Sequence, residues 1–309
     1  MCGSGKTEVV LSIISYVIEN GGKVGFVIPR RDVVIEIYLR LKYIFKRNTI
    51  VAVYGNHHEI LEADIICLTS HQLFRYKEYF DLVIFDEIDA FPYKENYVLN
   101  ALFFRSIRGN YVQMSATPSK KVLDFFRKEN RDILTLSVRY HHNPIPVPKI
   151  INAKYFIKYI YLYKYLKRFE KQNKPVFVFF PTIDNCEDTY NKLKLFFKKV
   201  NYIHSKRKDR ESVINHFRKG HTKILFTTAV LERGVTIKDL QVIIFNADNS
   251  IYDSAALIQI SGRVGRKKDA PEGEVIYISE KTTKAMEESI RNIKAANRDL
   301  QNMLKGSKP

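Results

Sequence analysis

Near its start the chain reads Cys2-Gly3-Ser4-Gly5-Lys6-Thr7, and an apolar stretch without Gly or Pro follows from Val9 to Ile18. The quoted residues match the end of the pattern G-x-x-x-x-G-K-[ST], whose backbone N–H groups wrap nucleotide phosphates. In such a loop the lysine reaches the outer phosphates and the Ser or Thr hydroxyl ligates Mg²⁺. A helix is expected next, because its N-terminus favours bound anions. A plain Gly-Ser turn before a helix is the alternative. The expected nucleotide-binding residues are Gly3, Ser4, Gly5, Lys6 and Thr7, with Thr7 also a ligand of Mg²⁺.

Composition limits the class of protein. A length of 309 residues suggests about two domains, and the net charge of +18 indicates a polyanionic partner, either nucleic acid or an anionic membrane surface. No apolar stretch approaches the roughly 18 residues of a membrane-spanning helix, and no signal segment is visible. The three cysteines are widely spaced, which favours a reducing cytosol and no zinc site.

The first half alternates apolar runs with helical patterns. Near-continuous runs of β-branched and other apolar residues are typical of parallel strands that are buried on both faces. The expected strands are 23–28, 50–54, 64–69, 82–85 and 111–115, and the expected helices lie near 31–46, 94–107 and 119–128.

The stretch Arg139–Pro148 contains three prolines in five residues and is expected to be an extended connection between domains. We therefore expect a first domain at 1–138, a linker at 139–150 and a second domain at 151–309. Both should be α/β, each a mostly parallel sheet flanked by helices. In the second domain the expected strands are 176–180, 223–228, 242–246 and 274–278, and the expected helices are 184–199, 208–219, 253–262 and 281–305.

An acidic tetrad, Asp86-Glu87-Ile88-Asp89, follows the apolar run Leu82–Phe85. The carboxyl edge of a parallel sheet is where ligand chemistry is placed. Asp86 is expected to hold Mg²⁺ through water, and Glu87 to orient and polarise an attacking water. A solvated acidic turn is the alternative, but it explains poorly why the tetrad directly follows a buried strand.

Three further motifs are modest when taken alone. Ser115-Ala116-Thr117-Pro118 follows an expected strand, and Thr227–Thr236 supplies hydroxyls and a glycine turn after another. The run Gln259–Arg266 lies on an expected helix and its exit. Arg263 and Arg266 are three residues apart, so we expect them to share a helix face. They could stabilise charge on a phosphate as an arginine finger does, or form a basic patch.

The order of these motifs is more specific than any one of them. The chain resembles superfamily 2 helicases and translocases, whose motifs I, II, III, V and VI occur in the same order on two α/β halves. Here these motifs read GSGKT, DEID, SAT, TT…RG and Q…GRxGR. The resemblance covers essentially the whole chain. It implies two RecA-like domains that sandwich ATP.

The resemblance also implies roles for individual residues. The glycine loop would bind ATP, and the acidic pair would serve Mg²⁺ and hydrolysis. Gln259, Arg263 and Arg266 would complete the site across the cleft, and Ser115 and Thr117 would couple the nucleotide state to domain closure. Nucleic-acid phosphates would be gripped by Arg30, Thr69, Thr227, Thr228 and Gly234.

A narrower resemblance is to the late competence proteins of the ComFA type. It rests on Asp86–Tyr93, Ile28–Val33, Thr69–Leu73 and the Arg139–Pro148 linker, while Leu231–Thr236 resembles both this family and the primosomal helicase PriA. The resemblance implies an ATP-dependent single-stranded-DNA translocase of natural transformation. Such an enzyme is cytoplasmic, acts at the inner face of the membrane, and works with a DNA channel and a phosphoribosyltransferase-like companion.

The chain departs from the family at its start. ComFA-like proteins usually begin with a four-cysteine zinc module and a strand leading into the phosphate loop, and the first loop glycine would precede Met1. We therefore expect an N-terminally truncated first domain. A PriA-like genome-maintenance helicase and a catalytically impaired DNA-binding remnant remain alternatives. An RNA helicase is disfavoured because motif II is not D-E-A-D.

Overall fold

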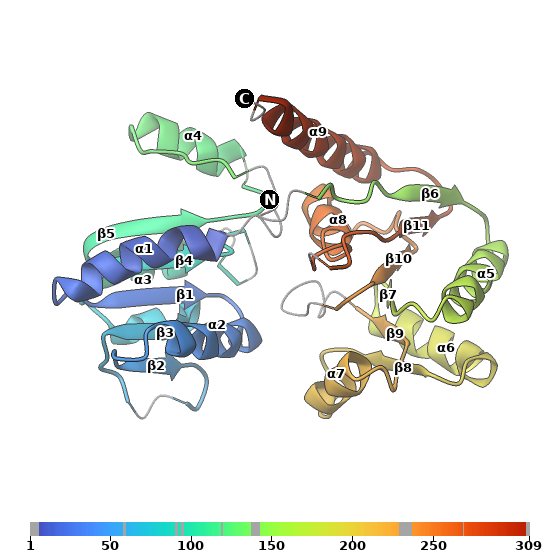
Figure 1. Cartoon of the computed structure of the whole chain (residues 1–309), viewed down its shortest axis with the longest axis horizontal. Coiled ribbons are helices and arrows are strands. Elements are labelled where there is room, and N and C mark those ends of the chain that lie inside the picture. The colour runs from blue at the N-terminus through green and yellow to red at the C-terminus, as the bar shows by residue number, and fades with distance from the viewer. Residues whose placement is uncertain are drawn as a thin grey trace. The chain divides into compact units, whose positions relative to one another are not determined.

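In the computed structural model the chain forms two compact units, Gly3–Leu136 and Ser137–Pro309. Each unit is built on one sheet of parallel strands with helices on both faces, which confirms the expected α/β class (Figure 1). The residues that the structure describes are 6–57, 60–89, 92–93, 96–118, 120–136, 143–228, 237–267 and 269–306.

The first unit holds a five-stranded sheet in the order β2-β3-β1-β4-β5, and every neighbouring pair is parallel. The five expected strands are present, but β4 and β5 begin earlier than their apolar runs indicated, because their first residues include polar and exposed positions. The strands are β1 (Val24–Ile28), β2 (Ile50–Val53), β3 (Ile65–Thr69), β4 (Phe80–Asp86) and β5 (Ile107–Met114). The helices are α1 (Lys6–Glu19), α2 (Arg31–Ile44), η1 (Ser70–Arg75), α3 (Tyr97–Ser106) and α4 (Lys120–Lys128).

Successive residues of a strand point to opposite faces of the sheet, so each strand feeds two cores. On one face Phe26 of β1 lies in a cluster with Ile14 of α1 and Leu41 of α2. On the other face its neighbour Val27 lies in a cluster with Phe103 of α3. All these side chains are fully buried, and burying each contributes roughly 1.5–3 kcal/mol.

The second unit holds a six-stranded parallel sheet in the order β6-β11-β10-β7-β9-β8. Its strands are β6 (Lys149–Asn152), β7 (Val176–Phe179), β8 (Val200–Ile203), β9 (Ile224–Thr227), β10 (Gln241–Phe245) and β11 (Val275–Ser279). Its helices are α5 (Ile157–Lys171), α6 (Ile183–Leu193), η2 (Lys194–Phe196), α7 (Arg210–Arg218), α8 (Ser254–Ser261) and α9 (Lys284–Gly306).

Three of these elements were not expected from the sequence: α5, β6 and β8. The strand β6 pairs with β11, so the sheet of the second unit begins at Lys149, inside the range 139–150 that was expected to be linker. Helix α5 carries a readable signal, since its buried Leu162, Leu166 and Phe169 recur at helical spacing. Many tyrosines and isoleucines in the same stretch favour a strand and obscure that signal.

The two cysteines within the described residues are packed in hydrophobic cores. Cys67 lies in a core of the first unit and Cys186 in a core of the second. Burial raises the pKa of both thiols above the ordinary value, so they stay protonated at neutral pH.

A carboxylate ties three strands together at the amino edge of the first sheet. Asp81, in β4, accepts a hydrogen bond of 2.8 Å from the Lys23 backbone N–H just before β1. It also accepts hydrogen bonds of 2.9 and 2.7 Å from the Arg108 guanidinium on β5. A Cβ at Gly109 would lie 2.3 Å from the Asp81 carbonyl oxygen, so only glycine fits beside this contact. Partial burial alone would raise the pKa of Asp81, but the Lys23 and Arg108 donors outweigh it and hold the pKa below its ordinary value.

We therefore expect Asp81→Asn to lower the free energy of unfolding at pH 7 by about 1–2 kcal/mol, measured by urea denaturation. A depressed pKa contributes stability above the unfolded-state value of about 3.9, and this contribution is lost as the pH falls through the folded-state pKa. The gap between wild type and variant should therefore close below about pH 4. Asp124→Asn is the control, because Asp124 pairs with Arg127 on the exposed surface of α4. A gap of constant size from neutral to acidic pH would contradict the charge-based account.

Candidate active site

Parallel pairing brings the ends of four strands to one edge of the first sheet. Ile28, the last residue of β1, pairs with Thr69, the last residue of β3. Asp86, the last residue of β4, pairs with Met114 of β5. The residues that follow these strands therefore share the carboxyl edge of the sheet with Thr69 and Asp86, and they include Arg30.

Lys6 and Asp86 face each other near this edge. Lys6 is the first residue of α1, and its Nζ lies 3.9 Å from Asp86 Oδ1. The Lys6 side chain is 19% exposed and that of Asp86 is 15% exposed, so the pair is sheltered and still accessible. Thr7 occupies the next position of α1, while Gly3, Ser4 and Gly5 lie outside the described residues.

Glu87 has an unusual backbone. Its φ of 60° lies in the left-handed region, which costs free energy for a residue with a Cβ. Its N–H donates a 2.9 Å hydrogen bond to Asp86 Oδ1. The turn at Glu87 lets the next N–H, that of Ile88, donate to the Met114 carbonyl oxygen at 3.3 Å. Strained backbone of this kind is concentrated at functional sites.

Asp89 connects the acidic tetrad to the motif after β5. The Ser115 hydroxyl donates to Asp89 Oδ1 at 2.8 Å, and the Thr117 hydroxyl donates to Asp89 Oδ2 at 2.8 Å. The Thr117 N–H also donates to the Ser115 hydroxyl at 3.0 Å. Ser115 and Thr117 were expected to act in coupling, but no role was expected for Asp89. The available signal was its place as the third acidic residue of the tetrad.

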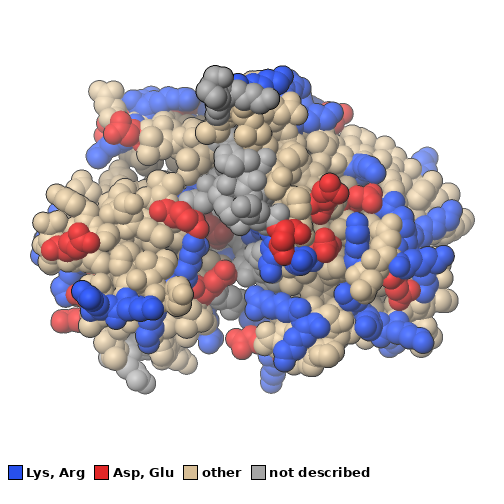
Figure 2. Space-filling view, in the orientation of Figure 1, with Lys and Arg blue, Asp and Glu red and all other residues tan. Residues whose placement is uncertain are grey.

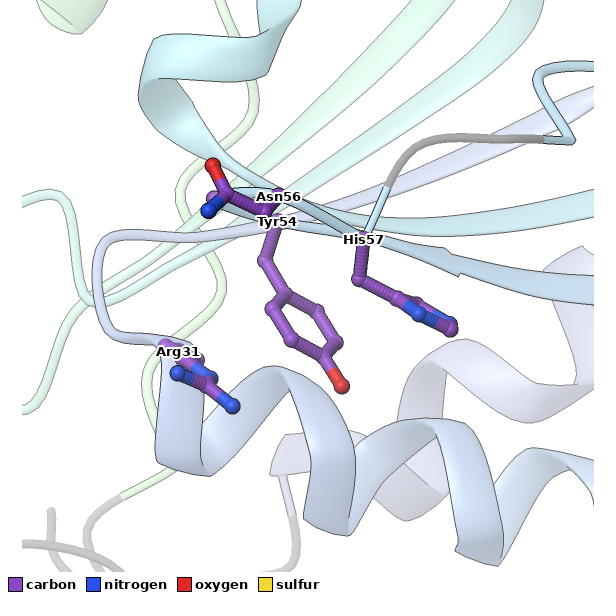
Figure 3. A pocket seen from close by; sticks show the side chains of 5 residues that line it. Arg31, Tyr54, Asn56 and His57 are labelled. Carbon is purple, nitrogen blue, oxygen red and sulfur yellow. The ribbon is translucent and has the colours of Figure 1, made fainter.

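The nucleic-acid candidates of this unit differ in exposure. Thr69 is 8% exposed at the end of β3, whereas Arg30 is half-buried at the N-cap position of α2. A pocket lies nearby, at the start of α2 and the turn after β2 (Figure 3). It is lined by Arg31, Tyr54, Gly55, Asn56 and His57 and has a volume of about 420 Å³. This pocket was not predicted, although the sequence shows Gly55, Asn56 and His57 directly after an expected strand that ends at Tyr54.

In the second unit the two expected threonines lie at the carboxyl end of β9. Thr227 is fully buried and its hydroxyl donates to the Thr228 carbonyl oxygen at 3.0 Å. Gly234 lies outside the described residues. The neighbouring strand β8 ends beside Thr227 and is followed by His204, whose Nε2 lies 2.8 Å from Glu187 Oε1. Neither β8 nor the contact between His204 and Glu187 was expected from the sequence.

The expectation that Arg263 and Arg266 share a helix face is wrong. Helix α8 ends at Ser261, with Gly262 as C-cap, and Gly265 has a positive φ of 66°. Both arginines therefore lie beyond the helix, and the positive φ between them, at Gly265, favours glycine. Their environments also differ. Arg263 is fully buried, whereas Arg266 is partly exposed and donates from Nε to the Gly262 carbonyl oxygen at 3.0 Å. Gln259, on α8, is 6% exposed.

The positive charge is unevenly divided. Residues 137–309 contain 33 of the 51 Lys and Arg but only 17 of the 33 Asp and Glu, so the second unit carries most of the net charge. On the face shown in Figure 2, Lys and Arg side chains are dense over the part of this unit where α5, α6 and α7 lie. In the described part of the chain, no helix combines the length and apolar character needed to span a membrane.

Two family models match the chain in succession. A DEAD/DEAH box helicase model matches residues 1–125, and a helicase conserved C-terminal domain model matches residues 157–268. Each match covers most of one unit, so each unit corresponds to one of the two helicase domains that the motif order indicated.

Curated relatives extend over nearly the whole chain. It is 33% identical over 307 residues to the competence protein ComFA of Bacillus subtilis, which covers 96% of this chain and 66% of that protein. It is 31% identical over 308 residues to the competence protein ComFA of Streptococcus pneumoniae, covering 96% and 71%. The chain thus spans about two thirds of the length of these relatives.

Solved structures share the fold. A variant of Saccharomyces cerevisiae Dbp5 bound to RNA and ADP BeF3 has a TM-score of 0.73 at 18% identity, covering 99% of this chain and 86% of that one. RecG bound to a three-way DNA junction has a TM-score of 0.65 at 20% identity, covering 99% and 43%. Helicase family models and ComFA relatives match along the length of this chain. The chain therefore belongs to the ComFA competence proteins, within the ATP-hydrolysing superfamily 2 helicases.

Proposed function

We propose that the chain is an ATP-dependent motor that translocates along single-stranded DNA during natural transformation. The proposal rests on the carboxyl edge of the first sheet. There Lys6 Nζ lies 3.9 Å from Asp86 Oδ1, and Asp89 accepts hydrogen bonds from the Ser115 and Thr117 hydroxyls. A cation–carboxylate pair beside a hydrogen-bonded acidic loop is an arrangement suited to phosphate chemistry. By the same proposal the motor works at the inner face of the membrane, with a DNA channel and a phosphoribosyltransferase-like companion.

The residues present fit ATP with Mg²⁺. Mg²⁺ is commonly held by one or two carboxylates together with substrate phosphates and water. Asp86 supplies the sheltered carboxylate, Thr7 a hydroxyl, and Lys6 the cation for the outer phosphates. When bound, Mg²⁺ would neutralise phosphate charge. The N-terminus of α1 adds its dipole to the same task.

Hydrolysis is assigned to Glu87, and charge stabilisation to the second unit. Glu87 directly follows Asp86, in a turn that holds it at the carboxyl edge, and a carboxylate there can orient the attacking water. Arg266, which is partly exposed, is proposed to stabilise charge that develops on the phosphates. Arg263 is fully buried and Gln259 is 6% exposed, and we propose that both serve the nucleotide site together with Arg266.

Lys6→Ala should weaken nucleotide binding, and Glu87→Gln should spare binding while slowing DNA-stimulated ATP hydrolysis by roughly 10²–10⁴-fold. Nucleotide affinity and steady-state ATPase are measured separately for each variant. Glu78→Gln is the matched control for Glu87, because Glu78 also has a positive φ, of 46°, but precedes β4 at the other edge of the sheet. Full ATPase activity in Glu87→Gln would remove Glu87 from the mechanism.

Coupling between hydrolysis and DNA is assigned to the Asp89 contacts. Thr117→Val keeps the shape of the side chain and removes its donor to Asp89. We expect basal ATPase to persist while stimulation by single-stranded DNA falls roughly tenfold, since a hydrogen bond to a charged group is worth about 1.5 kcal/mol or more. Thr189→Val is the control, because the buried Thr189 hydroxyl has no hydrogen-bond partner among the described residues. Equal loss of basal and stimulated rates in Thr117→Val would argue for a purely structural contact.

The DNA grip is assigned to phosphate contacts by Arg30 and Thr69 in the first unit and by Thr227, Thr228 and Gly234 in the second. The net charge of +18 supports a backbone grip that ignores sequence. The logarithm of the affinity should then fall by about 0.7 per phosphate neutralised for each tenfold rise in salt.

Arg30→Ala should lower that salt slope by about 0.7 and weaken all sequences alike, because a phosphate contact carries no base information. Labelled oligonucleotides of varied sequence are titrated over a salt series. Arg47→Ala is the control, because Arg47 is an exposed arginine that shortly precedes β2, at the opposite edge of the sheet. Strong sequence preference together with a flat salt response would contradict the translocase proposal.

A further inference from the structure

The turn after β2 is a tight hairpin that presents two rings on one side. Tyr54 and His57 exchange backbone hydrogen bonds, with N···O distances of 2.9 and 2.7 Å, and form an antiparallel bridge. Gly55 has a positive φ of 46°, as the first central residue of a hairpin turn with a primed geometry requires. Directly paired residues on such a hairpin project to the same face, so the backbone itself sets the two rings side by side.

The rings form a stack with a guanidinium. The Tyr54 and His57 ring centroids are 5.0 Å apart with planes 26° from parallel, and the Arg31 guanidinium lies 4.9 Å from the Tyr54 centroid. In Figure 3 the Tyr54 ring lies between Arg31, at the start of α2, and His57. His57 and Arg31 are exposed, so both ends of the stack are open to solvent.

We propose that this stack binds an unstacked nucleobase of single-stranded DNA. The proposal rests on the proposed function and adds a second mode of contact to it. Flat rings and guanidinium planes accept base faces, and every base has such a face, so the contact tolerates any sequence. A duplex keeps its base faces covered, so stacking selects single strands in a way that phosphate contacts do not.

The position of the stack favours this occupant. β2 lies next to β3 in the sheet, and β3 lies next to β1. The turn Tyr54–His57 therefore lies at the carboxyl edge of the sheet, where Thr69 and Arg30 also lie. A strand whose phosphates contacted those two residues would run along the same edge of the sheet as this turn. Asn56 and His57 are exposed, so the turn is not packed into a core.

The test measures base stacking apart from charge. Full-length chain is titrated with oligo-dT and with the same oligomer in which several bases are replaced by abasic sites, which retain the phosphates. His57→Ala and Tyr54→Leu remove rings, and Tyr54→Phe retains one. Tyr43→Leu is the matched control, because Tyr43 is 76% exposed on α2 and also lies under a cation, with Lys46 Nζ at 5.2 Å.

We expect His57→Ala and Tyr54→Leu each to weaken oligo-dT binding by about 5- to 150-fold, the range for one stacked base. Binding of the abasic oligomer should change little, and the salt slope should stay the same. Tyr54→Phe and Tyr43→Leu should bind as wild type does. Equal losses on oligo-dT and abasic oligomers, or no loss on either, would overturn the stacking proposal and leave the proposed function standing. Wild-type chain that bound neither oligomer would overturn the proposed function itself.

A second readout does not depend on affinity. The chain contains no tryptophan, so His57→Trp introduces a single indole at the open end of the stack, which can be excited apart from the tyrosines. Its emission should be quenched when oligo-dT binds and not when the abasic oligomer binds. Oligo-U is titrated in parallel, and a base-dependent signal confined to the RNA oligomer would refute the assignment to DNA. Quenching by both oligo-dT and its abasic form would show that the base is not stacked there.

Discussion

Parallel pairing of β1 with β3 and β4 is the constraint on which the first unit depends. Its register places Ile28 beside Thr69 and Val27 beside Phe85. Because the strands run the same way, every loop that leaves their carboxyl ends emerges at one edge of the sheet. This pairing places residues that are far apart in the chain at the same edge of the sheet. Examples are Arg31 after β1 and Ser115 after β5.

The sheet architecture could be predicted from sequence because buried parallel strands are continuous apolar runs, and all five expected strands of the first unit are present. The family resemblance assigned Lys6 and Asp86 to one nucleotide site, and in the structure Lys6 Nζ lies 3.9 Å from Asp86 Oδ1. The environment of Arg263 could not be predicted, since a spacing of three residues implies a shared face only while the helix continues. Here α8 ends at Ser261, before either arginine, and Gly265 takes a positive φ between them. The role of Asp89 as an acceptor for two hydroxyls depends on the pairing of β4 with β5, which local sequence does not encode.

The two units contribute differently to binding an anionic polymer. The first unit is nearly balanced in charge, and the second holds most of the excess of Lys and Arg. Long-range attraction would therefore come mainly from residues 137–309, whereas the stack that is proposed to bind a base lies in the first unit. By these proposals, attraction of the strand and stacking of its bases are separable, and salt screens the attraction more strongly than the stacking.

The backbone at Glu87 sets the stability of the fold against the chemistry proposed for this residue. A residue with a Cβ at a φ of 60° is held there at a free-energy cost, and glycine at the same position would not bear that cost. Replacing Glu87 by glycine would therefore tend to stabilise the fold while removing the carboxylate. The carboxylate that is proposed to orient the attacking water is thus held in place at the expense of folding stability.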